Sequence, residues 1–392
     1  MLFSLALIFI VGFMLSGIFN KLKLPGILGM LLTGIILGPF VLNLISQEVL
    51  DISSELRQIA LIVILARAGL SLNISDLRKV GRPAILMCFV PATFELIGVA
   101  LLAPLIFNIS YIEALIMGAV LAAVSPAVIV PRMLKVMESG YGKEKSIPQI
   151  ILAGASVDDI FVIVLFSAFI EMYGGKTFNV LSLLSVPISI ILGLAVGVVV
   201  GFLLVWIFKK FEMSDTIRVL IVLSTAFLLV TLEGALKSHI PMSGLLGVMA
   251  LGAIILKKNN ILADSLSSKF SKVWIGAEVL LFVLVGVAVD VRYMAAAGIM
   301  AVVFILSVLV FRLFGVYLCL LKTKLNKKEK IFCMISYLPK ATVQAAIGAV
   351  PLAQGVEAGK TILTIAVLAI IITAPIGAIG VDRTYKKLLE KS

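Results

Sequence analysis

The chain has 392 residues, of which 61% are hydrophobic and 14% are charged. Its mean hydropathy of +1.21 excludes a soluble globular protein, in which roughly half of the residues are apolar and about a quarter are charged. The net charge of +12 does not indicate nucleic-acid binding, because the basic residues fall in short loops and form no single patch. One histidine excludes a histidine-based metal site, and the sequence contains no G-x-G-x-x-G or Walker motif. We therefore expect neither an enzyme nor a cofactor.

Apolar segments of about 17–25 residues, the length that crosses a hydrocarbon core, follow one another along the chain. They predict an all-α membrane protein with about 13 transmembrane helices in a single integral membrane domain, residues 1–392. The first segment has no basic residue before it and no cleavage site typical of a signal peptide, so we expect an uncleaved helix. The predicted helices are 2–19, 24–40, 56–73, 83–107, 111–134, 148–171, 182–208, 216–232, 241–256, 273–289, 294–321, 330–353 and 361–380.

Positive charge alternates between the loops of this arrangement. Of the 33 Lys and Arg residues, 25 fall in every second loop or at the helix ends next to it, beginning with Lys21 and Lys23. Five fall in the remaining loops or at the helix ends next to them, and three lie deep inside helices. Cytoplasmic loops carry an excess of Lys and Arg. The alternation therefore predicts a multi-pass protein of the cell inner (cytoplasmic) membrane, with its N-terminus outside and its C-terminus in the cytoplasm.

Short patterns recur along the chain at a nearly constant offset. The Gly-Ile-Leu-Gly sequence at 26–29 is matched by Gly-Leu-Leu-Gly 218 residues later, and the segment that begins at Pro126 is matched 213 residues later at Pro339. Because the second set begins an odd number of helices after the first, its topology is inverted. Inverted repeats are typical of secondary transporters, so we expect an inverted-repeat antiporter or related transporter fold.

Two adjacent carboxylates, Asp158 and Asp159, lie near the middle of the predicted helix 148–171. At about 1.5 Å per residue, Asp158 is roughly 15 Å from the start of the helix, which is too deep for a helix-end pair that reaches the interface. Carboxylates at that depth are costly unless they face a wet cavity or a cation. The same oxygens can hold either a proton or a hard cation such as Na⁺. The pair therefore predicts a midplane site where a cation exchanges for a proton.

Two predicted helices contain internal prolines, Pro126 in 111–134 and Pro339 in 330–353. Proline removes a backbone donor, and broken membrane helices persist only where protein or a water-filled cavity satisfies the freed backbone groups. We expect two broken helices that cross; the alternative is an ordinary proline kink in each. Lys340, directly after its proline, is expected to offset the negative helix ends at the crossing.

Glu95 and Arg312, which are 217 residues apart, lie deep in predicted helices. An unpaired arginine at such a depth is very costly, and equivalent positions of inverted repeats can meet. We therefore expect a core ion pair between them, with the alternative that each pairs with another residue such as Asp158. Arg67 and Glu278 also lie in predicted helices, and their roles, structural or functional, stay open.

Three segments carry a family resemblance that spans nearly the whole chain. They are Gly-Ala-Val-Leu-Ala-Ala-Val-Ser-Pro-Ala-Val-Ile-Val-Pro at 118–131, Ala-Ser-Val-Asp-Asp-Ile at 155–160 and Leu-Pro-Lys-Ala-Thr-Val-Gln-Ala-Ala-Ile-Gly at 338–348. Together they closely resemble the NHA clade of sodium/proton antiporters, within the cation:proton antiporter superfamily. The resemblance implies secondary active exchange of Na⁺ or Li⁺ for H⁺.

The resemblance also implies roles for individual residues and helices. Asp159 would be the principal ion ligand, Asp158 its neighbour, and Ser125 with its unwound backbone would line the site. The protein would be a homodimer in the lipid bilayer, whose mobile core domains move like elevators against a static dimer domain. By order in the chain, the core helices would lie at about 83–171 and 294–380, the dimer-side helices at about 2–73 and 216–289, and the linker helix at about 182–208.

One departure from the family pattern concerns stoichiometry. Electrogenic double-aspartate members carry lysine on the helix that here carries Arg312, and arginine does not readily release a proton. The sequence decides neither the stoichiometry nor the choice among Na⁺, Li⁺ and K⁺. Alternatives of the same fold are a potassium/proton antiporter, a ligand-gated potassium efflux system and a sodium-coupled organic-anion symporter. A non-transporting sensor or structural protein would not need two buried carboxylates.

Overall fold

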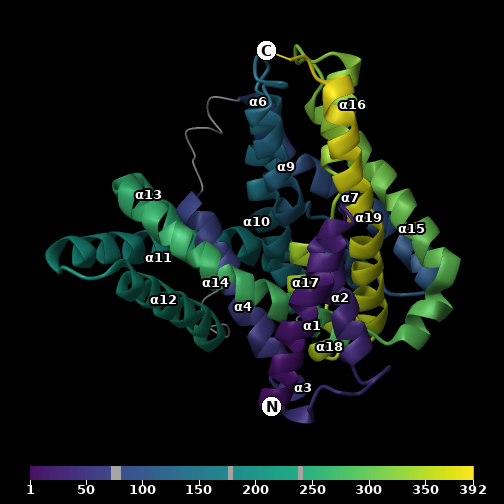
Figure 1. Cartoon of the computed structure of the whole chain (residues 1–392), viewed down its shortest axis with the longest axis horizontal. Helices are drawn as coiled ribbons and strands as arrows, with labels where there is room; N and C mark the ends of the chain where they lie inside the picture. Colours follow the sequence, from purple (N-terminus) through teal and green to yellow (C-terminus); the bar gives the residue numbers. More distant parts are fainter. Residues whose placement is uncertain (72–80, 175–179, 237–241, 392) are drawn as a thin grey trace. The chain divides into compact units, whose positions relative to one another are not determined.

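The computed structural model describes residues 1–71, 81–174, 180–236 and 242–391, and Figure 1 shows them as an assembly of helices. These residues contain no β-strand; an isolated bridge joins Tyr141 to Lys391. Nine helices of the described residues are long and apolar enough to cross a membrane. The fold is therefore all-α, as the sequence predicts. The count of thirteen transmembrane helices and the inverted repeat stay predictions, and the predicted loops at 74–82, 172–181 and 233–240 lie partly outside the described residues.

The chain divides into two compact units. Unit 1 comprises Met1–Ser53, Ser75–Gly174 and Phe282–Ser392, and unit 2 comprises Ser54–Ile74 and Gly175–Leu281. This division rests on compactness alone. The predicted division into core, dimer-side and linker helices therefore stays a prediction.

Unit 1 holds the helices from which the candidate site is built. In this unit α7 packs against α15 and α8, α10 against α8 and α9, and α19 against α16. The helices of unit 1 are α1 (Leu2–Lys21), α2 (Gly26–Leu37), α3 (Gln47–Asp51), α6 (Arg82–Met87), α7 (Val90–Phe107), α8 (Tyr111–Leu121), α9 (Pro126–Glu138), α10 (Ile147–Tyr173), α15 (Val291–Cys319), α16 (Lys327–Ser336), α17 (Thr342–Ile347), α18 (Val350–Ala353) and α19 (Gly359–Leu388).

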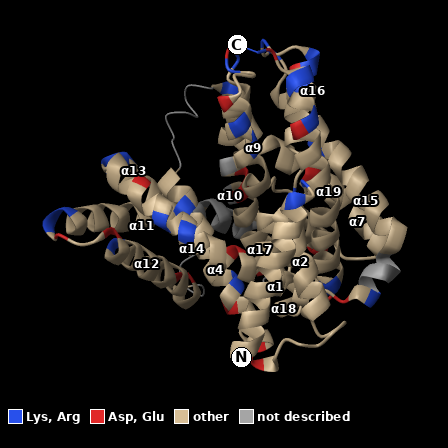
Figure 2. Ribbon diagram, viewed as in Figure 1, with Lys and Arg blue, Asp and Glu red and all other residues tan. Residues whose placement is uncertain are grey.

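Unit 2 is built mainly from long apolar helices, with α11 and α12 both packed against α13. Its helices are α4 (Ser53–Ser71), α11 (Val180–Lys210), α12 (Asp215–Leu236), α13 (Gly244–Lys258) and the first part of α14 (Asn260–Val287), which continues into unit 1 after Leu281. Charged residues gather mostly at helix ends in Figure 2, while the long helices are largely uncharged along their length. This distribution is the one that a membrane-embedded bundle requires.

The predicted loop between residues 256 and 273 is wrong, because α14 already begins at Asn260. Leu262, Leu266 and Phe270 are buried at successive intervals of four residues. That spacing places them on one face of a helix, while Lys272 is exposed. A search for continuous apolar runs misses an amphipathic helix start of this kind.

Close helix packing in unit 1 depends on small residues at particular contacts. In α2, a Cβ atom at Gly29 would lie 2.5 Å from the backbone carbon of Leu15 in α1. Only glycine permits the two backbones to approach so closely. Gly29, in the Gly-Ile-Leu-Gly pattern at 26–29, therefore permits the close packing of α2 against α1.

A polar strap joins three helix ends of unit 1 close to the C-terminus. Lys145, between α9 and α10, donates to Glu329 Oε1 at 2.8 Å and to Glu390 Oε2 at 3.2 Å. Glu329 also forms a capping box with Asn326 at the start of α16. Leu389 is buried in the adjoining apolar cluster. The strap thus connects the start of α10, the start of α16 and the end of α19.

The strap predicts a pH-dependent contribution to stability. The hydrogen bond to Glu329, and then that to Glu390, raises the pKa of Lys145 above its ordinary value. A raised pKa means that the stabilisation is complete below the unfolded-state pKa of about 10.4 and is lost as pH rises through the folded-state pKa. We expect Lys145→Met to lower the Tm at pH 7 to 9, with the difference from wild type vanishing in strong alkali. A Tm difference that is the same across this whole range would contradict the assignment.

Candidate functional site

Two helices are interrupted where the sequence places Pro126 and Pro339. The helix α8 ends at Leu121 and α9 begins at Pro126, with Ser125 in an extended conformation. A residue before proline is driven out of the α-helical region, which explains why the turn does not continue through Ser125. Likewise α16 ends at Ser336 and α17 begins at Thr342. Both residues 122–125 and residues 337–341 are therefore non-helical linkers.

The two interruptions lie against each other. The backbone N–H of Ser125 donates to the carbonyl oxygen of Pro339 at 2.8 Å. The side-chain amide of Gln344, in α17, donates to the carbonyl of Ala123 at 3.0 Å. The hydroxyl oxygens of Ser125 and Thr342 are 3.4 Å apart. The expected crossing of two broken helices is thus present, and several of its freed backbone groups are satisfied within the protein, as a membrane interior requires.

Arg312, from α15, is fully buried at this crossing and bridges two carboxylates. Its Nη1 lies 2.9 Å from Glu95 Oε2, and its Nη2 lies 2.9 Å from Asp158 Oδ2. Its Nε donates to the carbonyl of Tyr337 at 2.7 Å, and Nη1 also donates to the carbonyl of Ala122. The structure therefore contains the predicted ion pair with Glu95 and also the alternative contact with Asp158, because a planar guanidinium donates in several directions at once.

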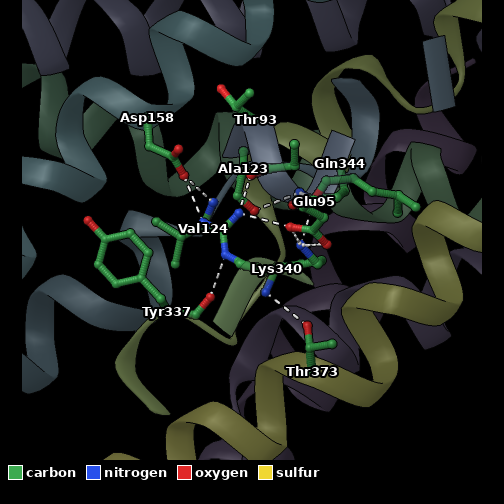
Figure 3. A network of polar contacts seen from close by, with 12 residues as sticks. Thr93, Glu95, Ala123, Val124, Asp158, Tyr337, Lys340, Gln344 and Thr373 are labelled. Carbon is green, nitrogen blue, oxygen red and sulfur yellow. Dashed lines mark hydrogen bonds and ion pairs between the residues drawn. The ribbon is translucent and has the colours of Figure 1, made fainter. Parts of the chain in front are cut away.

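Lys340 completes the ion-pair network from the second interruption. Its Nζ lies 2.6 Å from Glu95 Oε1 and donates to the carbonyl of Leu121, the last residue of α8, at 2.6 Å. Its ammonium group thus lies at the C-terminal end of α8, where a helix carries partial negative charge; that it offsets this charge stays a prediction. Its backbone N–H donates to the hydroxyl of Thr373 in α19 at 2.9 Å. Figure 3 shows this network, with Lys340 and Glu95 on one side and Asp158 on the other.

Asp158 is held by a backbone amide and by Arg312, and it makes no ion pair with Lys340 among the described residues. Its Oδ2 accepts from the backbone N–H of Val124 at 2.8 Å and from Arg312. The reason is geometric: the Lys340 side chain is engaged by Glu95 and the end of α8. Asp158 is fully buried, and its Oδ1 has no hydrogen-bond partner among the described residues.

Asp159 stands apart from this network. Neighbouring positions on a helix point about 100° apart, so its side chain leaves α10 in a different direction from Asp158. It is partly buried, and its Oδ1 is a buried atom without a hydrogen-bond partner in the part of the chain that the structure describes. Glu95, Asp158, Arg312 and Lys340 balance one another in formal charge. Asp159 is the additional carboxyl group beside this balanced set.

Sequence reasoning missed Gln344 and Tyr337 as parts of the site. Gln344 is fully buried and donates to the carbonyls of Leu121 and Ala123. A signal existed for it, since a polar residue one turn after Lys340 in an apolar segment is costly without partners. Arg67 and Glu278, whose roles the sequence left open, belong to unit 2 and are not members of this cluster.

Comparisons with known proteins agree with this architecture. The sequence profile of the transmembrane sodium/hydrogen exchanger family matches residues 5–387. The chain is similar to sodium/hydrogen exchanger 9B2 of Mus musculus, with 32% identity over 379 residues that cover 94% of this chain and 69% of the relative. It is also similar to sodium/hydrogen exchanger 9B1 of Homo sapiens, with 33% identity over 387 residues that cover 94% of this chain and 73% of the relative.

A solved structure shares the fold. The sodium proton antiporter MjNhaP1 from Methanocaldococcus jannaschii superposes with a TM-score of 0.87 at 22% sequence identity, covering 98% of this chain and 97% of that one. The agreement therefore extends over the whole helical bundle. Together with the family profile and the 9B relatives, it shows that the chain is a multi-pass membrane protein that belongs to the sodium/hydrogen exchanger family.

Proposed function

We propose that this protein is a secondary active antiporter that exchanges Na⁺, or Li⁺, for H⁺ at Asp158 and Asp159. One observation carries the assignment: Asp159 is a partly buried carboxyl group beside four buried charges that already balance one another. An unpaired charge inside a membrane is unstable, so Asp159 is expected to hold either a proton or a cation. The similarity to a sodium/hydrogen exchanger 9B2 and to the sodium proton antiporter MjNhaP1 supports these substrates.

Asp159 serves as the principal ion ligand in this proposal and Asp158 as its neighbour. The Oδ1 atoms of both residues have no hydrogen-bond partner among the described residues, so each offers an oxygen to a hard cation. No group of three or more His, Cys, Asp or Glu side chains that could hold a metal ion occurs in the described residues. Further ligands would then come from hydroxyl groups such as that of Ser125, from free carbonyls or from water, which suits Na⁺ as a transported substrate.

The carbonyls at the end of α8 are poor candidates for cation ligands in this conformation. Leu121 accepts from Lys340 and Gln344, Ala122 accepts from Arg312, and Ala123 accepts from Gln344. Their role is to anchor the broken helix. The cation is therefore expected on the Asp158–Asp159 side of the crossing.

Access to the site would alternate between the two sides of the membrane by an elevator-type movement of a core domain in a homodimer. Support comes from the ion pairs among Glu95, Asp158, Arg312 and Lys340. All four residues lie in the predicted core helices, so the cluster could move as one body without breaking its ion pairs. We place the protein in the cell inner membrane, with the N-terminus outside and the C-terminus in the cytoplasm, because Lys and Arg alternate between loops. An inverted repeat of about 13 transmembrane helices would provide the two related access routes.

Proton flux in proteoliposomes tests the function. Purified protein is reconstituted with a pH-sensitive dye inside, and Na⁺, Li⁺ and K⁺ are added in turn at clamped voltage. We expect Na⁺ or Li⁺ to drive proton movement and K⁺ to have little effect. Exchange with K⁺ alone would replace the assignment with a potassium/proton antiporter.

The balanced charges predict electroneutral exchange. If Glu95 and Asp158 stay ionised beside Arg312 and Lys340, the site carries no net charge either with one proton or with one Na⁺ on Asp159. One H⁺ then moves for one Na⁺. The measurement is the reversal condition in proteoliposomes, with voltage set by valinomycin and potassium while the sodium gradient varies at a fixed pH difference. A null point that shifts with voltage would instead require a two-proton cycle.

The Arg312→Lys variant is the companion test of this stoichiometry. Lysine can release a proton when buried, whereas arginine cannot, so we expect the substitution to introduce voltage dependence. If the variant remains electroneutral, the identity of this side chain does not set the stoichiometry.

A further inference from the structure

Tyr337 contacts the ion-pair network at Arg312, and it has no part in the exchange of ions proposed above. It follows α16 and is fully buried. Its carbonyl accepts from Arg312 Nε at 2.7 Å, and its ring centroid lies 5.5 Å from Arg312 Cζ. A guanidinium group is attracted to the face of an aromatic ring. One residue therefore holds Arg312 through both its backbone and its side chain.

Gly154, in α10, leaves the space that the Tyr337 side chain occupies. A Cβ atom at Gly154 would overlap Tyr337 Oη and lie 2.7 Å from Met87 Cβ. Gly154 precedes Asp158 by four residues, so the two positions share one face of α10. Figure 3 shows Tyr337 beside Asp158 and Val124. Tyr337 thus packs against the same face of α10 that carries Asp158.

We propose that Tyr337, seated against Gly154, is a positioning residue for cation binding. It fixes the guanidinium of Arg312 in the orientation that bridges Asp158 and Glu95, and this role rests on the antiport function proposed above. The bonds from a planar guanidinium are directional, so a tilt would weaken its contact with Asp158. The neighbouring cation would then meet a carboxylate whose position and charge are less well defined, and its affinity would fall.

A double-mutant cycle between Gly154 and Tyr337 tests this role. Gly154→Ala is made in the wild-type and in the Tyr337→Phe background, and the apparent KM for Na⁺ and the maximal rate are measured in proteoliposomes. In the wild-type background we expect the KM to rise about tenfold, because the new methyl group displaces Tyr337. In the Tyr337→Phe background the clash with the oxygen is absent and only the contact with Met87 Cβ remains. Met87 makes no contact with Arg312 or Asp158 in the network described above, so we expect the same change to raise KM by no more than about twofold.

A control separates positioning from general loss of packing. Gly29→Ala also places a methyl group against a backbone in unit 1, at the contact of α2 with α1. We expect it to lower the Tm without raising the KM for Na⁺, and Tyr337→Phe should not rescue it. An equal rise of KM on Gly154→Ala in both backgrounds, or an unchanged KM in folded Gly154→Ala protein, would overturn the role of Tyr337.

Two further measurements distinguish a folding defect or a transport defect from a loss of cation binding. If Gly154→Ala does not fold, Tyr337→Leu removes the ring and retains the backbone carbonyl; an unchanged KM would then overturn the role and a raised KM would support it. Stabilisation of the detergent-solubilised variants by Na⁺ in thermal unfolding reports binding without transport. Absence of exchange in the wild type would contradict the antiport function, whereas loss of the Gly154–Tyr337 coupling in an active exchanger would contradict only the positioning role.

Discussion

Replacement of Asp159 by asparagine is expected to reduce sodium-dependent proton flux to the level of protein-free liposomes. The amide removes both the proton site and the negative charge that attracts the cation, while the size of the side chain is retained. The ion pairs of Arg312 and Lys340 do not include Asp159, so the protein should still fold with a Tm close to that of the wild type. Flux is measured in proteoliposomes at saturating Na⁺.

Two further Asp-to-Asn variants, one at the surface and one at the site, serve as controls for this result. Asp264→Asn changes an exposed residue of α14 in unit 2 and should leave flux unchanged. Asp158→Asn removes a buried carboxylate that accepts from Val124 and Arg312, so exchange with weaker ion affinity is expected if Asp158 only tunes the site. Flux near the wild-type rate in Asp159→Asn would disprove its role, and equal loss in both site variants would remove the distinction between them.

The second large effect is expected at the pair formed by Glu95 and Arg312. Both side chains are fully buried with 2.9 Å between Nη1 and Oε2. Removal of one member leaves an unmatched charge and is expected to cost on the order of 3–5 kcal/mol in the free energy of unfolding. Glu95→Gln leaves the four-charge cluster with one excess positive charge, and Arg312→Gln leaves one excess negative charge. The double variant restores balance between Asp158 and Lys340, so it should be more stable than either single variant.

Thermal unfolding of the detergent-solubilised variants measures this coupling. The control is Arg132→Gln, which breaks a pair with Asp382 whose side chains are 18% and 40% exposed, at 3.4 Å; such pairs contribute no more than about 1 kcal/mol. Strictly additive losses in the Glu95–Arg312 cycle would show that the two residues do not interact.

Local sequence signals predicted those parts of the site that depend on the chemistry of a single segment. Proline located both helix interruptions, and the cost of burying an isolated charge indicated that Glu95 and Arg312 would need partners. The sequence could not specify which acceptors each cation contacts. Lys340 pairs with Glu95 and donates to the carbonyl of Leu121. Asp158 accepts hydrogen bonds from Arg312 and from the backbone N–H of Val124. These partners depend on how two interrupted helices cross, which is a property of the tertiary structure.

Tyr337 illustrates a different limit of sequence reasoning. An apolar helix end with a tyrosine carries no local sign that its ring lies beside a guanidinium or that a glycine of α10 makes the necessary space. Likewise, the helical start of α14 depends on an amphipathic spacing that a count of continuous apolar residues passes over. For α14 the signal is local, whereas for Tyr337 the deciding partners, Arg312 and Gly154, lie on other helices, far along the chain.

The contacts at the end of α8 imply that the interruption does not depend on Pro126 alone. In a continuous helix the carbonyl of each residue accepts from the N–H four positions later, so Leu121 would bind the N–H of Ser125. That N–H instead donates to Pro339, and the carbonyl of Leu121 is occupied by Lys340 and Gln344. Two of the backbone groups that would join α8 to α9, the Leu121 carbonyl and the Ser125 N–H, are thus already bonded to residues of the opposite broken helix. Residues of the second interruption bond backbone groups that a continuous helix would need, so each broken helix prevents the other from becoming continuous.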